Sequence, residues 1–165
     1  MSRALFVRNR QRARRVDARQ LRSAARTLLQ DLLGRDQFDL GIYVVAAPEM
    51  TRLNESFLGH SGSTDVITFD YHGHDGPSSS TILHGEIFIC IDEAIRQAKL
   101  FHASWQTEVA RYLVHGVLHL AGYDDRRPAD RARMKRRENA LLRQLGKRQP
   151  LSRLAAPRQP RAGEG

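Results

Sequence analysis

The stretch from Ser104 to Gly122 constrains the fold more than any other part of the chain. Most positions between Val109 and Leu120 are apolar. A helix that is apolar on nearly all sides is stable only in the interior of a domain. Ser104 is a suitable N-cap for this helix, and Gly122 is a suitable end. The sequence therefore predicts a central, buried helix against which the rest of the chain packs.

Local patterns predict the remaining elements. Runs of β-branched and aromatic residues predict strands over residues 5–9, 40–46, 64–71 and 85–91. Periodic apolar positions with caps and stops predict further helices over residues 17–34, 48–59, 92–102 and 128–145. This order favours an α+β fold, in which a single mixed β-sheet of about four strands carries packed helices.

Length and composition bound the class of protein. A chain of 165 residues is long enough for one domain with its own core. We expect residues 1–147 to form that domain, and residues 148–165, which hold three prolines and few large apolar side chains, to form a flexible basic tail. No apolar run approaches the roughly 20 residues of a membrane span, and the basic N-terminus lacks the apolar region of a signal peptide. The single cysteine, Cys90, excludes an internal disulfide, so we expect a reducing, cytoplasmic location.

Charge is distributed unevenly along the chain, whose net charge is +9. Residues 1–35 contain ten arginines and two acids, residues 36–125 four basic and thirteen acidic residues, and residues 126–165 thirteen basic and three acidic residues. A polyanion would be attracted to the two basic arms, whereas the acidic middle suits a cation. Arginine-rich helices are also common as solvated surfaces, so charge alone identifies no substrate.

The central helix ends in the sequence "HGVLHLAGYDD", which has the spacing of a metal site. His115 and His119 are four residues apart, so their rings project side by side from one helix face. If Gly122 reverses the chain, Asp125 can return to the same point as a third ligand. Three protein ligands leave one coordination position for water, which is typical of catalytic rather than structural zinc. We therefore predict one divalent metal ion, with Zn²⁺ as the expected ion, bound by His115, His119 and Asp125.

Two other interpretations of the histidine pair remain open. Each ring can simply be hydrogen-bonded within the core, which is the commoner fate of a histidine in an apolar helix. The pair also partly matches the H-E-x-x-H motif of metalloproteases, but Gly116 stands where that motif has its general base. A metalloprotease-like hydrolase is therefore a minor alternative.

The same stretch resembles the signature of the YbeY family of bacterial rRNA-maturation endoribonucleases, H-G-x-L-H-L-x-G-Y-D-H. Two further segments, "LNESFLGHSGSTDVITF" and "HGEIFIC", resemble other conserved blocks of that family in the same order. The resemblance implies an α+β catalytic domain and metal-dependent cleavage of single-stranded RNA. It also implies a role in 16S rRNA 3′-end maturation and ribosome quality control. The implied partners are the 16S rRNA precursor, the small ribosomal subunit and assembly proteins, with no membrane and no DNA.

The sequence departs from the family pattern at two positions. The family's third metal ligand is a histidine, whereas this chain has Asp125, whose carboxylate is also an accepted zinc ligand. The family's arginine after the "LNESF" block is replaced by Leu58, which cannot steady a phosphate. This second departure supports an alternative function, that of a non-catalytic RNA-binding ribosome-assembly factor that keeps the fold.

Candidate catalytic residues follow from the second departure. Arg52, Arg126 or Arg127 could supply the missing guanidinium, and we expect Arg52 and Arg126 to do so. Glu86, at the start of a predicted strand, is a candidate general base or a support for the metal ligands. Attack on the phosphate by activated water or by the 2′-hydroxyl of the RNA cannot be distinguished from the sequence.

Overall fold

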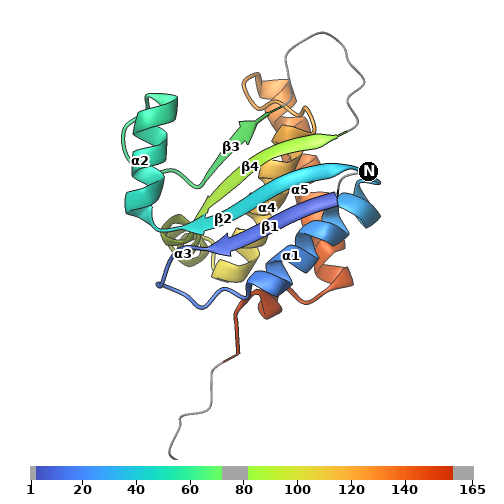
Figure 1. Ribbon diagram of the computed structural model, residues 1–165, viewed down its shortest axis with the longest axis horizontal. Coiled ribbons are helices and arrows are strands. Elements are labelled where there is room, and N and C mark those ends of the chain that lie inside the picture. The colour runs from blue at the N-terminus through green and yellow to red at the C-terminus, as the bar shows by residue number, and fades with distance from the viewer. Residues whose placement is uncertain (1–2, 72–81, 158–165) are drawn as a thin grey trace, which may run out of the picture.

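The computed structural model describes residues 3–71 and 82–157, so the predicted loop over residues 72–81 lies outside the described residues. Its strands are β1 (Arg3–Asn9), β2 (Phe38–Val45), β3 (Val66–Asp70) and β4 (Leu83–Cys90). They form one sheet in the order β1-β2-β4-β3, in which β1, β2 and β4 are parallel and β3 is antiparallel to β4 (Figure 1). The predicted α+β class with a single mixed sheet is confirmed.

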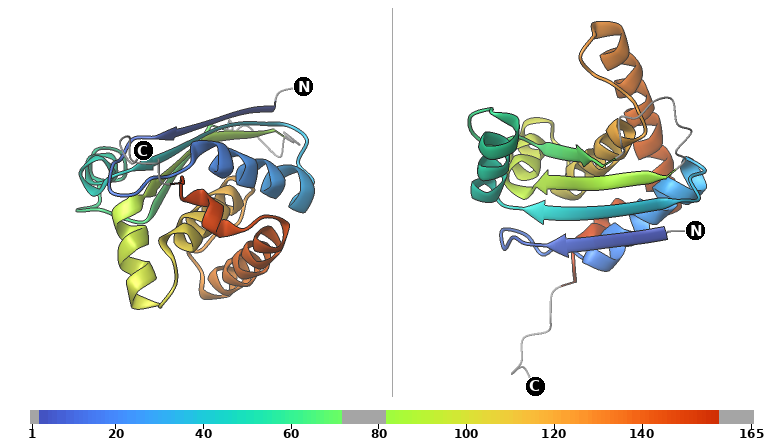
Figure 2. Two further views of the ribbon diagram at one scale, coloured as in Figure 1. Left: turned by 90° about the horizontal axis from the view of Figure 1, so that it is seen from below. Right: turned by 45° about the horizontal axis from the view of Figure 1, so that its top comes forward.

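The helices lie mainly on one face of this sheet (Figure 2). They are α1 (Ala18–Arg26) with a π-helical continuation η1 (Thr27–Leu32), α2 (Ala47–Leu58), α3 (Ile91–Leu100), α4 (Trp105–Leu120), α5 (Pro128–Arg148) and the short 3₁₀ helix η2 (Leu151–Leu154). Helices α1 and α4 lie against the sheet, and α5 packs against α4, whereas α2 lies beside the end of β2. No helix in the described ranges has both the length and the apolar composition of a membrane span.

Helix α4 is the central helix that the sequence predicts. The side-chain oxygen of Ser104 accepts a hydrogen bond from the backbone N–H of Thr107 at 3.1 Å and so begins the helix. Ten of its residues are buried, and Val117 has no exposed surface. A Cβ at Gly116 would lie 2.7 Å from Cγ2 of Ile87 on β4, so the glycine allows the helix to approach the sheet closely. This packing fixes the direction in which the end of α4 presents its histidines.

The prediction of a flexible tail from residue 148 is wrong for the residues up to 157. Leu154 is 1% exposed, and its carbonyl accepts a hydrogen bond from the backbone N–H of Asp17 at 2.8 Å. Ala155 forms an isolated β-bridge with Val16. Leu154 belongs to the core and Leu151 packs partly buried against it, and this apolar burial stabilises the segment against the domain. Residues 158–165 lie outside the described part of the chain.

Candidate metal centre

The end of α4 and the turn after it bring together His115, His119 and Asp125, hereafter the triad. The Nε2 atoms of the two rings are 3.0 Å apart. Oδ2 of Asp125 lies 3.4 Å from Nε2 of His119 and 3.8 Å from Nε2 of His115. All three side chains are partly buried, and they could hold a metal ion. These are the three residues that the sequence spacing singled out as ligands.

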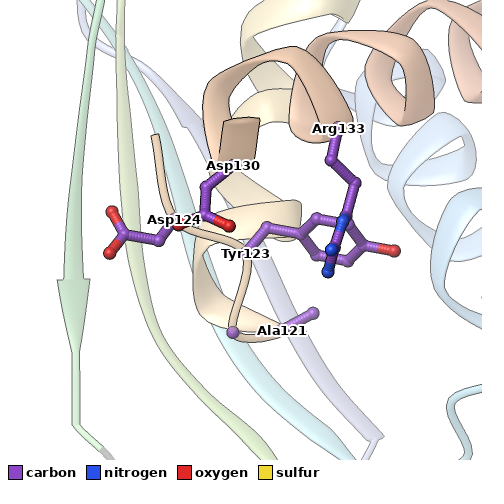
Figure 3. A pocket seen from close by; sticks show the side chains of 6 residues that line it. Ala121, Tyr123, Asp124, Asp130 and Arg133 are labelled. Atoms are coloured by element: carbon purple, nitrogen blue, oxygen red, sulfur yellow. The ribbon is translucent and has the colours of Figure 1, made fainter. Parts of the chain in front are cut away.

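A tight turn returns Asp125 to the helix. Gly122 has a φ of 102°, which favours glycine, and its N–H donates to the carbonyl of His119 at 3.0 Å. The neighbouring Asp124 points elsewhere and receives the guanidinium of Arg126 at 3.1 Å. Figure 3 shows a hollow of about 280 Å³ at this turn, which Tyr123, Asp124 and Arg133 help to line and in which Asp124 points away from Tyr123. The turn therefore assigns its two adjacent carboxylates to different surroundings.

Glu138 on α5 orients the first histidine. Its Oε1 lies 2.8 Å from Nδ1 of His115, while its Oε2 accepts from Lys135 at 2.9 Å and from Arg111 at 3.3 Å. Burial alone would raise the pKa of Glu138, but the hydrogen bonds from His115 and Lys135 outweigh it and lower the pKa to about 2. The carboxylate thus remains ionised and accepts the Nδ1 proton of His115. In the neutral ring, Nε2 then directs its lone pair toward the other two members of the triad.

Sequence reasoning missed Glu138, although a signal was present. The residue is 3% exposed and lies on the same face of α5 as Met134, Leu141 and Leu145. A lone carboxylate on the apolar face of a basic, amphipathic helix requires a buried partner. Its partner could not be named from the sequence, because it lies on another helix.

The surroundings of His119 favour its neutral form. Burial lowers the pKa of His119, and the ring of His115 lowers it further, whereas Asp125 and a hydrogen bond with the main chain of Tyr123 act in the opposite direction. The net effect is a lowered pKa. Neutral imidazole is the form that binds metal ions.

The donor set fits a zinc-like ion. When four ligand atoms surround a zinc ion in a tetrahedron, each about 2.1 Å from the metal, they lie about 3.4 Å from one another. The three distances within the triad, from 3.0 to 3.8 Å, bracket that value. Two imidazoles and one carboxylate also make up the protein ligands of known catalytic zinc sites. The residues present therefore suit a divalent ion with one position left for solvent or substrate.

Of the predicted catalytic arginines, the structure brings only Arg126 to the triad. A hollow of about 660 Å³ beside the triad is lined by Arg126, Leu58 and Thr68, among others, together with His119 and Asp125. Arg52 is exposed on α2 and does not line this hollow. Six residues on an α-helix separate it from Leu58 by about 9 Å along the axis and about 120° around it. The expectation that Arg52 reaches the same space as Leu58 is therefore not supported.

Glu86 lies on the other face of the sheet. Ile87 contacts α4, and because successive side chains on a strand alternate, Glu86 points away from that helix. Its carboxylate accepts a hydrogen bond from the hydroxyl of Tyr71. The structure therefore does not bring Glu86 to the triad. The strand pattern alone did not reveal which face of the sheet would carry the site.

Fold and site together define an α+β protein in which two histidines and one carboxylate converge in a group that could hold a metal ion. Comparison with known proteins is more specific: the chain belongs to the family described as endoribonuclease YbeY, whose model matches residues 6–146.

Relatives from several bacteria are similar over most of their length. An endoribonuclease YbeY of Chlorobium phaeovibrioides (strain DSM 265 / 1930) is 37% identical over 76% of this chain and 80% of its own. One from Salinibacter ruber (strain DSM 13855 / M31) is 34% identical over 79% and 84%. The solution structure of TM1509 from Thermotoga maritima matches with a TM-score of 0.61 at 21% identity, covering 94% of this chain and 99% of that one. This last likeness supports the fold.

Proposed function

We propose that this protein is a metal-dependent endoribonuclease specific for single-stranded RNA, acting in 16S rRNA 3′-end maturation and ribosome quality control. The observation that carries the proposal is the convergence of the triad in a chain of the endoribonuclease YbeY family. The expected cofactor is one divalent ion, Zn²⁺. The expected partners are the 16S rRNA precursor, the small ribosomal subunit and assembly proteins, in the cytoplasm.

The chain's own residues have distinct roles in this proposal. His115, His119 and Asp125 hold the ion, which when bound supplies Lewis acidity and activates water near neutral pH. Glu138 fixes the orientation and the Nδ1 proton of His115. Arg126, which lines the same hollow and is paired with Asp124, has further guanidinium N–H groups that can contact a phosphate oxygen.

Leu58 favours one alternative function. It lines the hollow beside the triad at the position where the family pattern has an arginine, and it is 45% exposed there. A leucine cannot stabilise negative charge that develops on a phosphate. A non-catalytic RNA-binding assembly factor would tolerate this residue, so binding of RNA without cleavage would favour the alternative.

Metal analysis and RNA cleavage test the proposal together. The purified wild type should contain close to one divalent ion per chain and cleave a single-stranded RNA, and a chelator should abolish cleavage. Asp125→Ala should lose both the metal and the activity. Asp124→Ala is the matched control for metal content, because it removes the adjacent carboxylate, which binds Arg126 and not the triad, and it should keep the metal. If the wild type contains no metal, or cleaves equally well with chelator, the proposal is wrong.

The ends of the products distinguish the two possible nucleophiles. Attack by the 2′-hydroxyl of the RNA leaves a 2′,3′-cyclic phosphate, whereas attack by water does not. A substrate with a single 2′-deoxy residue at the cleavage site provides the control. It should block only the first route.

A further inference from the structure

A trough extends from the triad along the groove between α4 and α5. A hollow of about 240 Å³ is lined by His115 and Asp125 and by residues of α5. A larger one, of about 570 Å³, continues to the end of α3. The two hollows share four lining residues: Asp65, Arg111, Tyr112 and Lys135. They therefore form one continuous depression with the candidate metal centre at one end, and its larger part is within the size range of small-ligand sites.

The charges lining the trough are already compensated. Arg111 contacts Glu138 at 3.3 Å and Glu108 at 3.5 Å, and it donates to Asn139 at 2.8 Å. Lys135 is bound to Glu138 at 2.9 Å. Over both hollows, three cationic side chains (Arg111, Arg131 and Lys135) lie among four carboxylates (Asp65, Glu108, Asp125 and Glu138), so no net positive charge is left to attract a phosphate. The trough suits an uncharged occupant with polar edges.

Three residues that line the trough have groups suited to a nucleobase. Tyr112 lines both hollows, and its buried hydroxyl has no hydrogen-bond partner in the described ranges 3–71 and 82–157. Asp65 also lines both hollows; its Oδ1 accepts from the N–H of Val66 at 2.8 Å, and its Oδ2 can accept an N–H from the edge of a base. At the rim, the ring of Phe101 is 70% exposed. Flat, exposed aromatic rings are the usual stacking surface for unpaired bases.

The end of α3 holds Phe101 in place. The next residue, His102, has a φ of 51° and is the one non-glycine residue with positive φ in the described part of the chain. The N–H of Ala103 donates to the carbonyl of Ala98 at 2.9 Å and closes this turn. The backbone that carries the ring is therefore held by the turn that ends α3. Sparsely populated backbone conformations of this kind concentrate at ligand-binding sites.

We propose that the trough binds an unpaired nucleoside of the RNA strand next to the bond that is cleaved, with its base stacked on Phe101. The proposal rests on the proposed function, because it assumes that the adjacent phosphate lies at the triad. In this arrangement the trough binds the neutral base and ribose, and the adjoining triad binds the phosphate. Such a site recognises a single strand, since a base within a duplex cannot enter a hollow.

Binding of a fluorescent single-stranded oligoribonucleotide, measured with a chelator present so that cleavage does not interfere, tests the subsite. Phe101→Ala should weaken binding about tenfold, which is typical for the loss of one stacked base. Phe101→Trp should restore it. Phe6→Ala is the matched control, because Phe6 is 58% exposed but lies on β1, away from the trough, and it should change binding less than twofold. With metal present, Phe101→Ala should raise KM by a similar factor, leaving kcat and the metal content within twofold.

The outcomes separate this inference from the proposed function. If Phe101→Ala binds RNA as the wild type does while cleavage persists, the subsite is wrong and the endoribonuclease proposal stands. If binding depends on Phe101 but the metal-loaded wild type cleaves nothing, the stacking of a base on Phe101 stands and the nuclease proposal falls. If Phe6→Ala weakens binding as much as Phe101→Ala, the trough is not the site of stacking.

Discussion

The carboxylate of Glu138 lies 2.8 Å from Nδ1 of His115, and the other ring nitrogen, Nε2, faces His119 and Asp125. Zinc enzymes repeatedly use a carboxylate in this way to fix the tautomer and the direction of a ligating histidine. Here the carboxylate is itself held by Arg111 and Lys135. The triad therefore depends on a residue that belongs to a different helix.

Glu138→Gln should weaken metal binding about 10- to 100-fold, because the neutral amide is a poorer acceptor for the Nδ1 proton and leaves the ring less basic. Competition with a chromophoric chelator would measure the affinity. Glu108→Gln is the matched control, since Glu108 is also buried and pairs with Arg111 but is not a partner of His115. Circular dichroism would verify that both variants fold. Equal metal affinity in Glu138→Gln and the wild type would contradict the role assigned to this residue.

Leu58→Arg should increase cleavage of single-stranded RNA by roughly tenfold or more. The side chain lines the hollow that contains His119 and Asp125, so a guanidinium there can contact a phosphate held at the triad. The initial rate with saturating metal would be measured against Phe6→Arg, which adds the same charge on β1. A rate unchanged from wild type, with Arg126 intact, would indicate that Arg126 already supplies the needed charge or that the phosphate lies elsewhere.

Much of the fold was predictable because its signals are local. The central helix follows from the apolar run between Ser104 and Gly122, and its caps are in the structure where the sequence places them. The geometry of the triad was also local, since two ligand candidates are one helical turn apart and the third follows a single glycine turn. Both signals lie within the one segment from Ser104 to Asp125.

What could not be predicted depends on how distant segments pack. The contact of Glu138 with His115 spans 23 residues and exists only because α5 returns along α4. The burial of Leu154 likewise depends on its meeting Asp17 at the other end of the chain. Glu86 was misjudged for a related reason: strand alternation defines two faces, but only tertiary packing decides which face lies next to α4.

Gly116→Ala should destabilise the protein by about 1–3 kcal/mol, although alanine is the better helix former. Its Cβ would lie 2.7 Å from Ile87 in the core, and overpacking there outweighs a gain in helix propensity of about 1 kcal/mol. Gly146→Ala on α5 is the matched substitution, because its Cβ would meet Leu151 at an ordinary 3.8 Å. It should stabilise by about 0.5–1 kcal/mol. Urea unfolding of both variants would show opposite shifts, and stabilisation by Gly116→Ala would refute the close approach of α4 to β4.

The Tyr71–Glu86 pair predicts a change in stability at high pH. The hydrogen bond to Glu86, together with partial burial, raises the pKa of Tyr71 to about 12. Because the folded state holds the phenolic proton more tightly than the unfolded state, this contribution is complete below about pH 10 and is lost as the pH rises toward 12. Ultraviolet titration of the wild type against Tyr71→Phe would isolate this group. Glu86→Gln should lower the pKa of Tyr71 and leave RNA cleavage unchanged, and a large loss of cleavage would show that Glu86 takes part in the reaction.

The outward face of α5 should act as a phosphate-binding surface for the substrate. Arg136, Arg143 and Lys147 are exposed and lie opposite the buried leucines of that helix, about 10 Å and 6 Å apart along its axis. Replacing all three with glutamine should weaken RNA binding and reduce the slope of log K against log salt by about 2, since each contact to a single strand contributes about 0.7.

The triple replacement of Arg19, Arg22 and Arg26 on α1 removes the same charge from another helix and is the matched control. Because a general loss of positive charge would affect both variants alike, a reduced slope confined to the α5 variant would locate the RNA on the helix that also carries Glu138. Equal slopes in the two variants would show that net charge, and not this surface, governs binding.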